Sequence, residues 1–157
     1  MFNDSMNWSD DWIWGLPLIL FTVLVHAFGL LLIRERIILK LEHAAGSRRF
    51  NALFAIVMGA SVLLLTILHG FEGGVWALAY LKLGALSNIR SAMLYSLSAM
   101  TSYGHANLFL APQWQLMGAL EALNGMMLFG LTTAFLFSVI QTVWPASPSS
   151  RQSGQPM

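Results

Sequence analysis

A run of nineteen residues, from Gly15 to Ile33, constrains the fold most, because its only polar side chains are Thr22 and His26. As an α-helix rising about 1.5 Å per residue, it is roughly 28 Å long, close to the thickness of the hydrocarbon core of a bilayer. A cleaved signal peptide begins with basic residues, whereas no Lys or Arg precedes Arg34. We therefore expect a retained first transmembrane helix over 15–33, after an extracytoplasmic segment over 1–14.

The composition agrees with a membrane protein. Of the 157 residues, 57% are hydrophobic and 10% charged, whereas soluble domains are about 45–50% apolar and 25% charged. A net charge of +1 without a basic patch argues against nucleic-acid binding. The absence of cysteine removes disulfides and thiolate chemistry. Because no catalytic motif or paired carboxylates occur, we predict no enzyme activity and no cofactor.

Two further apolar stretches predict two more spans. The second runs over Leu53–Leu68 and can extend toward Leu81, with glycines at 70, 73 and 74 that allow a bend or a helix end. The third covers 116–143, and a Pro- and Ser-rich segment over 144–157 is typical of a disordered tail.

The basic residues predict the orientation. Five of the eight lie in the segment 34–50, between the first and second spans: Arg34, Arg36, Lys40, Arg48 and Arg49. The positive-inside rule places that segment in the cytoplasm. The expected protein is multi-pass in a bacterial inner or plasma membrane, with its N-terminus outside and its tail cytoplasmic.

A fourth helix is too short to cross a bilayer. Ser87 or Asn88 can cap a helix over 89–100, which has only twelve residues. Since both neighbouring spans have their ends outside, this helix either lies on the outer surface or enters the membrane and returns. Composition does not choose between the two.

Residues 91–105, together with Glu121-Ala-Leu-Asn-Gly125, resemble the pore module of two-transmembrane potassium channels. In that family an outer helix leads to a pore helix, a Thr-x-Gly-Tyr-Gly-Asp filter and an inner helix. The resemblance implies an all-α membrane fold of three transmembrane helices plus a re-entrant pore helix and loop. The module covers 51–143, with the pore helix at 89–100, the filter-like loop at 101–106 and the inner helix at 116–143.

The resemblance assigns the filter-like loop to Thr101, Ser102, Tyr103, Gly104 and His105. It implies passive conduction of a monovalent cation, K⁺, through a homo-oligomer, most simply a tetramer, because one loop cannot enclose a pathway. Aligning Tyr103-Gly104 with the family's Tyr-Gly places Ser102 at a filter glycine, where a left-handed residue costs roughly 1–2 kcal/mol. Altered selectivity and a non-conducting interaction subunit therefore both stay open.

Several side chains are candidates for supporting or gating this loop. We expect Glu121 to form a hydrogen bond behind the loop, near Tyr95, Ser96 or Ser98, and Asn124 to extend that network. Gly125 or Gly130 can act as a hinge, or simply allow close packing. A ring of His105 imidazoles would sense pH, although an inert exposed histidine is the alternative.

Two histidines fall inside predicted spans. Counting from Gly15 puts His26 about 16 Å deep, whereas His69 is expected at the outer end of the second span. This count predicts a separation of more than 10 Å, too far for both to bind one haem iron. Near that outer end, Glu72 is expected to pair with Lys82 or Arg90, and Trp76 to anchor at the interface.

Overall fold

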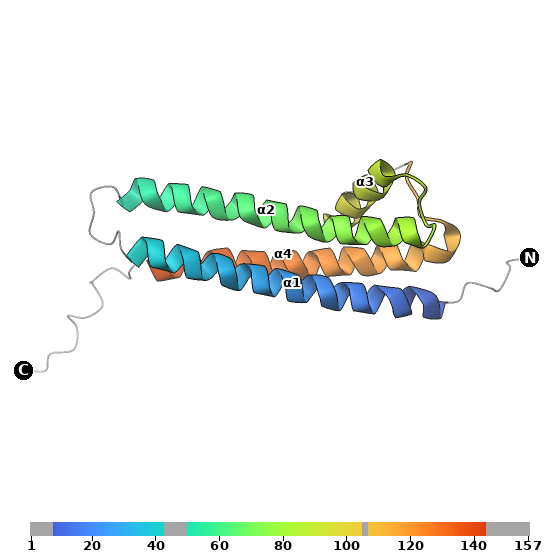
Figure 1. Ribbon diagram of the computed structural model, residues 1–157, viewed down its shortest axis with the longest axis horizontal. Helices are drawn as coiled ribbons and strands as arrows, with labels where there is room; N and C mark the ends of the chain where they lie inside the picture. Colours follow the sequence, from blue (N-terminus) through green and yellow to red (C-terminus); the bar gives the residue numbers. More distant parts are fainter. Residues whose placement is uncertain (1–7, 43–49, 105–106, 144–157) are drawn as a thin grey trace, which may run out of the picture.

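The computed structural model describes residues 8–42, 50–104 and 107–143. The elements are α1 (Trp8–Glu42), α2 (Phe50–Lys82), α3 (Ile89–Met100), a 3₁₀ turn η1 (Pro112–Trp114) and α4 (Gln115–Val143), and no strand occurs in the described ranges. The three long helices lie side by side, with α2 antiparallel to α1 and α4 (Figure 1). The short α3 tilts outward where α2 ends and α4 begins.

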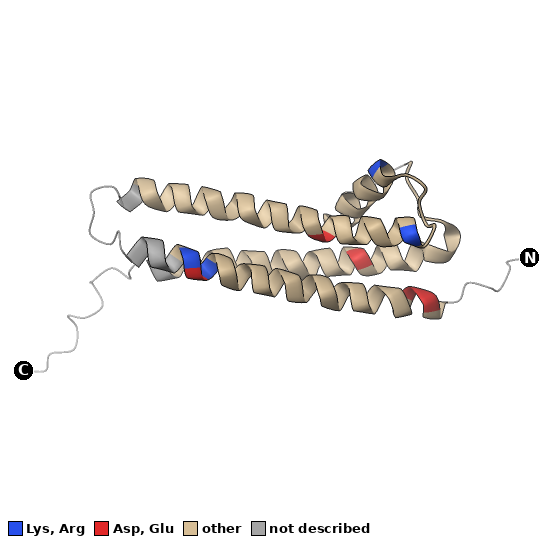
Figure 2. Cartoon of the chain, viewed as in Figure 1, with Lys and Arg blue, Asp and Glu red and all other residues tan. Residues whose placement is uncertain are grey.

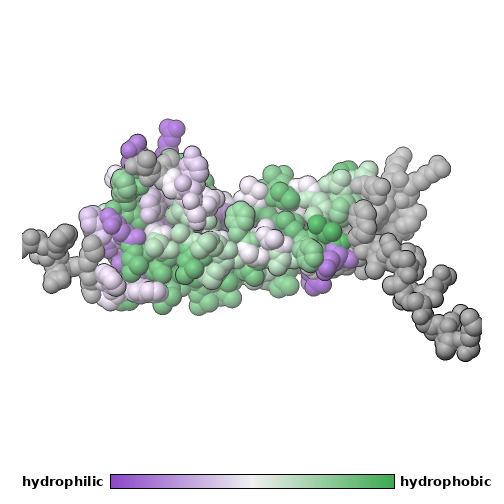
Figure 3. Space-filling view, turned by 180° about the vertical axis from the view of Figure 1, so that it is seen from behind, coloured by the Kyte–Doolittle hydropathy of each residue, from purple (hydrophilic) through white to green (hydrophobic). Residues whose placement is uncertain are grey.

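The three long helices are each long and apolar enough to cross a membrane, which confirms the predicted all-helical fold with three candidate spans. Charged residues gather near the two ends of the bundle, apart from one acidic position within α2 and one within α4 (Figure 2). The face in Figure 3 is mainly hydrophobic along the middle of the helices. Both features suit a bundle surrounded by lipid.

The helix α1 starts earlier than expected, and α2 reaches the full length that the sequence allowed. α1 begins at Trp8, seven residues before the predicted start of the span, and continues to Glu42. α2 runs through the glycines at 70, 73 and 74 as far as Lys82, so the helix does not end at the glycines that would have allowed it to. Without water, a broken helix would leave backbone groups unsatisfied in the membrane, which favours a continuous helix.

Local caps define the borders of α2 and α3. After α2, Gly84 adopts φ 66°, and Ala85 N–H donates to the Tyr80 carbonyl (2.9 Å), as in a Schellman cap. The helix α3 begins after Asn88, whose side-chain oxygen accepts the Arg90 N–H (2.7 Å). Its bounds, 89–100, are those predicted, and Asn88 is the cap.

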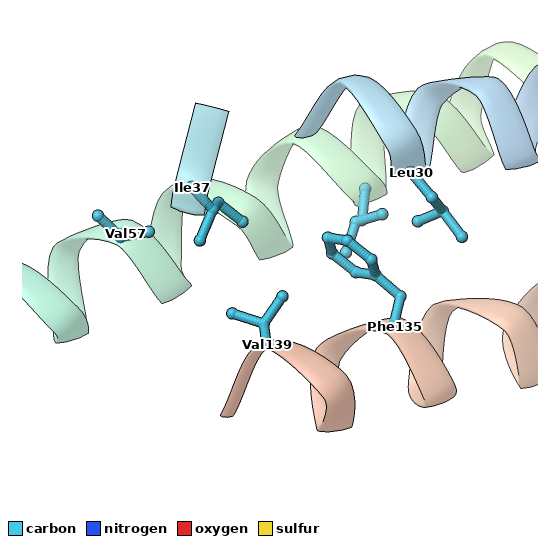
Figure 4. Close-up of a cluster of buried hydrophobic side chains, with 6 residues drawn as sticks. Leu30, Ile37, Val57, Phe135 and Val139 are labelled. Carbon is cyan, nitrogen blue, oxygen red and sulfur yellow. The ribbon is translucent and has the colours of Figure 1, made fainter. Parts of the chain in front are cut away.

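The core consists of two apolar clusters. One lies between α1, α2 and α4, where five labelled side chains point toward one another (Figure 4). The other lies nearer α3 and contains Trp76, Tyr80, Met117 and Leu120. Trp76 was expected at the interface, but the structure buries it completely, because α2 continues past it for six more residues within the bundle.

Asp11 joins α1 to the start of α4. Its carboxylate is buried and accepts the backbone N–H of Met117 (3.0 Å), in the first turn of α4. The first N–H groups of a helix have no partner within the helix, so an acidic side chain there stabilises it. The sequence had placed this residue outside the membrane helix.

Some predictions lie outside the described residues. These are the role of His105, the basic residues Arg48 and Arg49, and the tail over 144–157.

Candidate functional site: two buried polar clusters

The interior of the bundle also holds two groups of polar side chains. The first, which we call the Glu121 network, consists of Glu121 on α4, Tyr80 on α2, Ser96 on α3 and the Gly73 carbonyl. The second, the histidine cluster, consists of His26 on α1, His69 and Glu72 on α2, and Thr132 on α4. Each group joins three helices.

The Glu121 network holds α3 against α2 and α4. Tyr80 Oη donates to Glu121 Oε2 (2.6 Å), while Ser96 Oγ hydrogen-bonds to both Glu121 Oε1 and the Gly73 carbonyl, the latter at 2.8 Å. All three side chains are fully buried. Glu121 therefore lies behind α3, as predicted, and Ser96 is one of the partners that the sequence named.

The hydrogens of this network can be counted. Ser96 has one hydroxyl hydrogen but contacts two acceptors, and the Gly73 carbonyl has no hydrogen to give. Both contacts are satisfied when Glu121 carries a proton and donates to Ser96, which in turn donates to Gly73. Glu121 then accepts from Tyr80, and every polar side-chain atom of the Glu121 network is paired.

Two glycines of α4 allow α3 to approach closely. A Cβ atom on Gly125 would collide with the Met100 backbone, and one on Gly118 would collide with the Tyr95 hydroxyl. Tyr95 also meets Tyr80 edge-on, with ring centroids 5.5 Å apart. Gly125 thus has a packing role, and α4 remains helical through both Gly125 and Gly130.

The segment between α2 and α4, which contains α3, begins and ends at the same end of the bundle. Ala111 N–H donates to the Ala85 carbonyl (3.2 Å), so the chain between these residues begins and ends side by side. Within this segment Met100, at the end of α3, contacts Gly125, ten residues beyond the start of α4. At about 1.5 Å per residue, that contact lies roughly 15 Å along α4.

The described part of the filter-like loop, residues 101–104, is exposed. Ser102 N–H donates to the Ala99 carbonyl (3.0 Å) and Tyr103 N–H to the Ser98 carbonyl (3.0 Å), which is a Schellman cap. Ser102 (φ 54°) and Gly104 (φ 71°) have positive φ. These are the two positions that the resemblance aligns with the filter glycines.

Asn124 does not extend the Glu121 network. Its side-chain amide donates to Thr22 Oγ1 on α1 (2.8 Å), and its carbonyl oxygen is buried without a hydrogen-bond partner. The prediction relied on Asn124 and Glu121 sharing one face of α4. The packing of α1 against that face supplies a different partner.

In the histidine cluster, Glu72 lies between the two imidazoles. Glu72 Oε1 is 2.9 Å from His26 Nδ1, and Oε2 is 3.3 Å from His69 Nδ1. On the opposite side, Thr132 Oγ1 lies 3.0 Å from His26 Nε2 and 3.2 Å from His69 Nε2. The four side chains therefore close a ring, in which Glu72 Oε2 makes no well-aligned hydrogen bond.

The predicted separation of the histidines was wrong. Their ring centroids are 5.0 Å apart, because α1 begins seven residues earlier than assumed and α2 continues thirteen residues past His69. The expected pairing of Glu72 with Lys82 or Arg90 was wrong for the same reason, since Glu72 lies inside the bundle. The close rings still leave no room for a porphyrin between them.

One feature of the sequence indicates this cluster. His69 and Glu72 are three residues apart, so they share a face of α2; placing His26 beside them required the true register of α1. Comparison of the chain with family models, curated proteins and solved structures gave no match.

Proposed function

We propose that the chain is one subunit of a homo-oligomeric pore-loop channel for monovalent cations, K⁺ by resemblance. In this proposal α3 is a re-entrant pore helix, and residues 101–104 approach the symmetry axis from each subunit. The C-terminal part of α4 lines the rest of the pathway. Four copies are the simplest closed arrangement.

The observation that carries the proposal is the path of the chain from Ala85 to Ala111. It begins and ends at one point, and its turn lies roughly 15 Å along α4, beside Gly125. A helix lying flat on the outer leaflet would not reach so far along the neighbouring span. The Glu121 network supports the same interpretation, because its buried bonds fix α3 in that position.

Two further features favour cation passage and assembly. The C-terminal end of α3 has a partial negative charge, which attracts a cation near Thr101. The glycines Gly70 and Gly74 on α2 have open space where a side chain would be. Small residues four apart on a membrane helix permit close contact with another copy.

A second candidate function is a non-conducting interaction subunit that keeps this architecture. The Schellman cap favours it, because the turn at 101–104 closes the end of α3 with backbone bonds. A potassium filter instead stacks rings of backbone carbonyls that point toward its axis.

Ion flux through reconstituted protein separates the two candidates. We expect purified protein in planar bilayers to pass current under opposed K⁺ and Na⁺ gradients. Gly125→Leu should abolish the current, because its side chain would displace the Met100 backbone and release α3. Gly59→Leu is the matched control. Because Gly59 faces open space on α2, this variant should conduct normally.

Absence of current from well-folded oligomers would reject the channel and leave the interaction subunit. Equal currents in Gly125→Leu and the unaltered protein would reject α3 as the pore helix. The oligomeric state, measured as the mass of the detergent-solubilised complex, should be four chains.

A further inference from the structure

We propose that His26, His69 and Glu72 bind a divalent transition-metal ion of the zinc class, with Thr132 orienting both imidazoles. This site is independent of conduction, because it is built entirely within one chain. It also goes beyond anything that the resemblance to potassium channels implies.

The donor set and its spacing suit such an ion. Two imidazoles and one carboxylate are typical ligands of catalytic or exchangeable zinc sites, which keep one position open. The potential ligand atoms of the three residues all lie within 4.8 Å of one another. In a tetrahedral site with bonds of about 2.0–2.1 Å, ligand atoms are roughly 3.3 Å apart. Each oxygen of Glu72 is already close to that spacing from one imidazole, since Oε1 lies 2.9 Å from His26 Nδ1 and Oε2 lies 3.3 Å from His69 Nδ1.

The hydrogen count gives a second, independent argument. The ring has four contacts, but a carboxylate, two neutral imidazoles and one hydroxyl supply only three hydrogens. Glu72 Oε2 is the buried atom left without a hydrogen-bond partner. An ion bound between the two Nδ1 atoms and Glu72 removes the need for the missing hydrogen.

With the ion in that position, Thr132 has a defined role. Each imidazole then carries its hydrogen on Nε2, and both hydrogens point at Thr132 Oγ1, which has two lone pairs to accept them. Partners of this kind fix the tautomer and orientation of metal-binding histidines. Stacking of His69 on Phe129, with centroids 5.4 Å apart, orients the same ring further.

Charge and access also favour a cation. The carboxylate of Glu72 is buried in the bundle, and no Lys or Arg of the described residues pairs with it. A bare negative charge in a membrane interior is costly, and a bound cation balances it. Beside His69 lies a cavity of about 30 Å³ that reaches Thr101 at the end of α3, and it is large enough to hold one water molecule.

The test uses the full-length chain in detergent, prepared without a polyhistidine tag. The chain has four histidines and no cysteine, so the double variant His43→Ala/His105→Ala retains only the two histidines of the cluster. We expect this background to bind one Zn²⁺ per chain in equilibrium dialysis. Co²⁺ in its place should give the visible absorption of a four-coordinate nitrogen and oxygen site.

In the same background, His69→Ala and Glu72→Gln should lose this stoichiometric binding. Thr132→Val should weaken it about 10- to 100-fold, the usual effect of removing a partner of a metal ligand, whereas Thr132→Ser should restore it. Thr133→Val is the matched control, because Thr133 is exposed and bonds only to the Phe129 carbonyl of its own helix. Circular dichroism identifies any variant that fails to fold, and Glu72→Gln and Thr132→Val then carry the test.

Failure to bind zinc in the double-variant background would overturn the proposal. Equal zinc affinity in Glu72→Gln and its parent would overturn it as well. Neither result bears on ion flux, so the channel proposal stands or falls separately.

Discussion

Two glutamates of the described residues are buried, in similar positions but with opposite surroundings. Glu121 and Glu72 are both fully buried, and each joins three helices. With Glu121 protonated, every contact of its network has a hydrogen. With Glu72 ionised and both imidazoles neutral, the histidine cluster is one hydrogen short, and Glu72 Oε2 has no hydrogen-bond partner. A satisfied network stabilises one arrangement of helices, and an unsatisfied one indicates a place for a ligand.

The largest expected effect comes from deleting the satisfied network. Glu121→Leu leaves the buried Tyr80 hydroxyl without an acceptor and breaks the link to Ser96, so the free energy of unfolding should fall by roughly 3 kcal/mol. Unfolding in mixed SDS micelles, followed by the fluorescence of the six tryptophans, measures this loss. The same replacement at exposed Glu35 should change stability by less than about 0.5 kcal/mol. Equal losses at both sites would mean that the network does not hold α3.

The next effect comes from filling the histidine cluster. A ligand at about 100 times its dissociation constant stabilises the state that binds it by about 2.7 kcal/mol. Adding Zn²⁺ should therefore raise the unfolding free energy of the unaltered chain by about that amount, but leave Glu72→Gln unchanged. A zinc response of the same size in both proteins would place the ion elsewhere, and the contrast between the two glutamates would disappear.

The sequence predicted the elements of this fold better than their depth. Apolar runs identified three spans, and the cap at Asn88 identified α3, because local side chains and hydrophobicity decide both. The placement of Glu121 behind α3 also followed from the sequence. The histidine cluster did not follow from the sequence, because it depends on the register of α1 against α2. An apolar helix end carries little information about that register. Asn124 was misassigned because helix periodicity gives a face and does not give the partner that covers it.

A smaller effect is expected at the turn that follows α3. The caps after α2 and α3 have the same bonds, but Gly84 occupies the left-handed position in one and Ser102 in the other. If the Glu121 network holds α3 in place against this strain, Ser102→Gly should raise the unfolding free energy by about 1–2 kcal/mol per chain. Gly84→Ser should lower it by a similar amount. A loss of stability in Ser102→Gly would show that the serine side chain, rather than the network, stabilises this turn.

The smallest expected effect is the sharpest test of the difference between the glutamates. Glutamine has the shape of a protonated glutamate, with an amide that donates where the carboxyl hydrogen did and a carbonyl that still accepts from Tyr80. Glu121→Gln should therefore change the unfolding free energy by less than about 1 kcal/mol, since no buried group loses its partner. Ion flux should also persist, because α3 stays in place. A loss as large as that of Glu121→Leu would mean that Glu121 is ionised, with Ser96 donating to it instead of to the Gly73 carbonyl. The two glutamates would then differ in their partners alone, and each would be a buried carboxylate that no cation of the described residues balances.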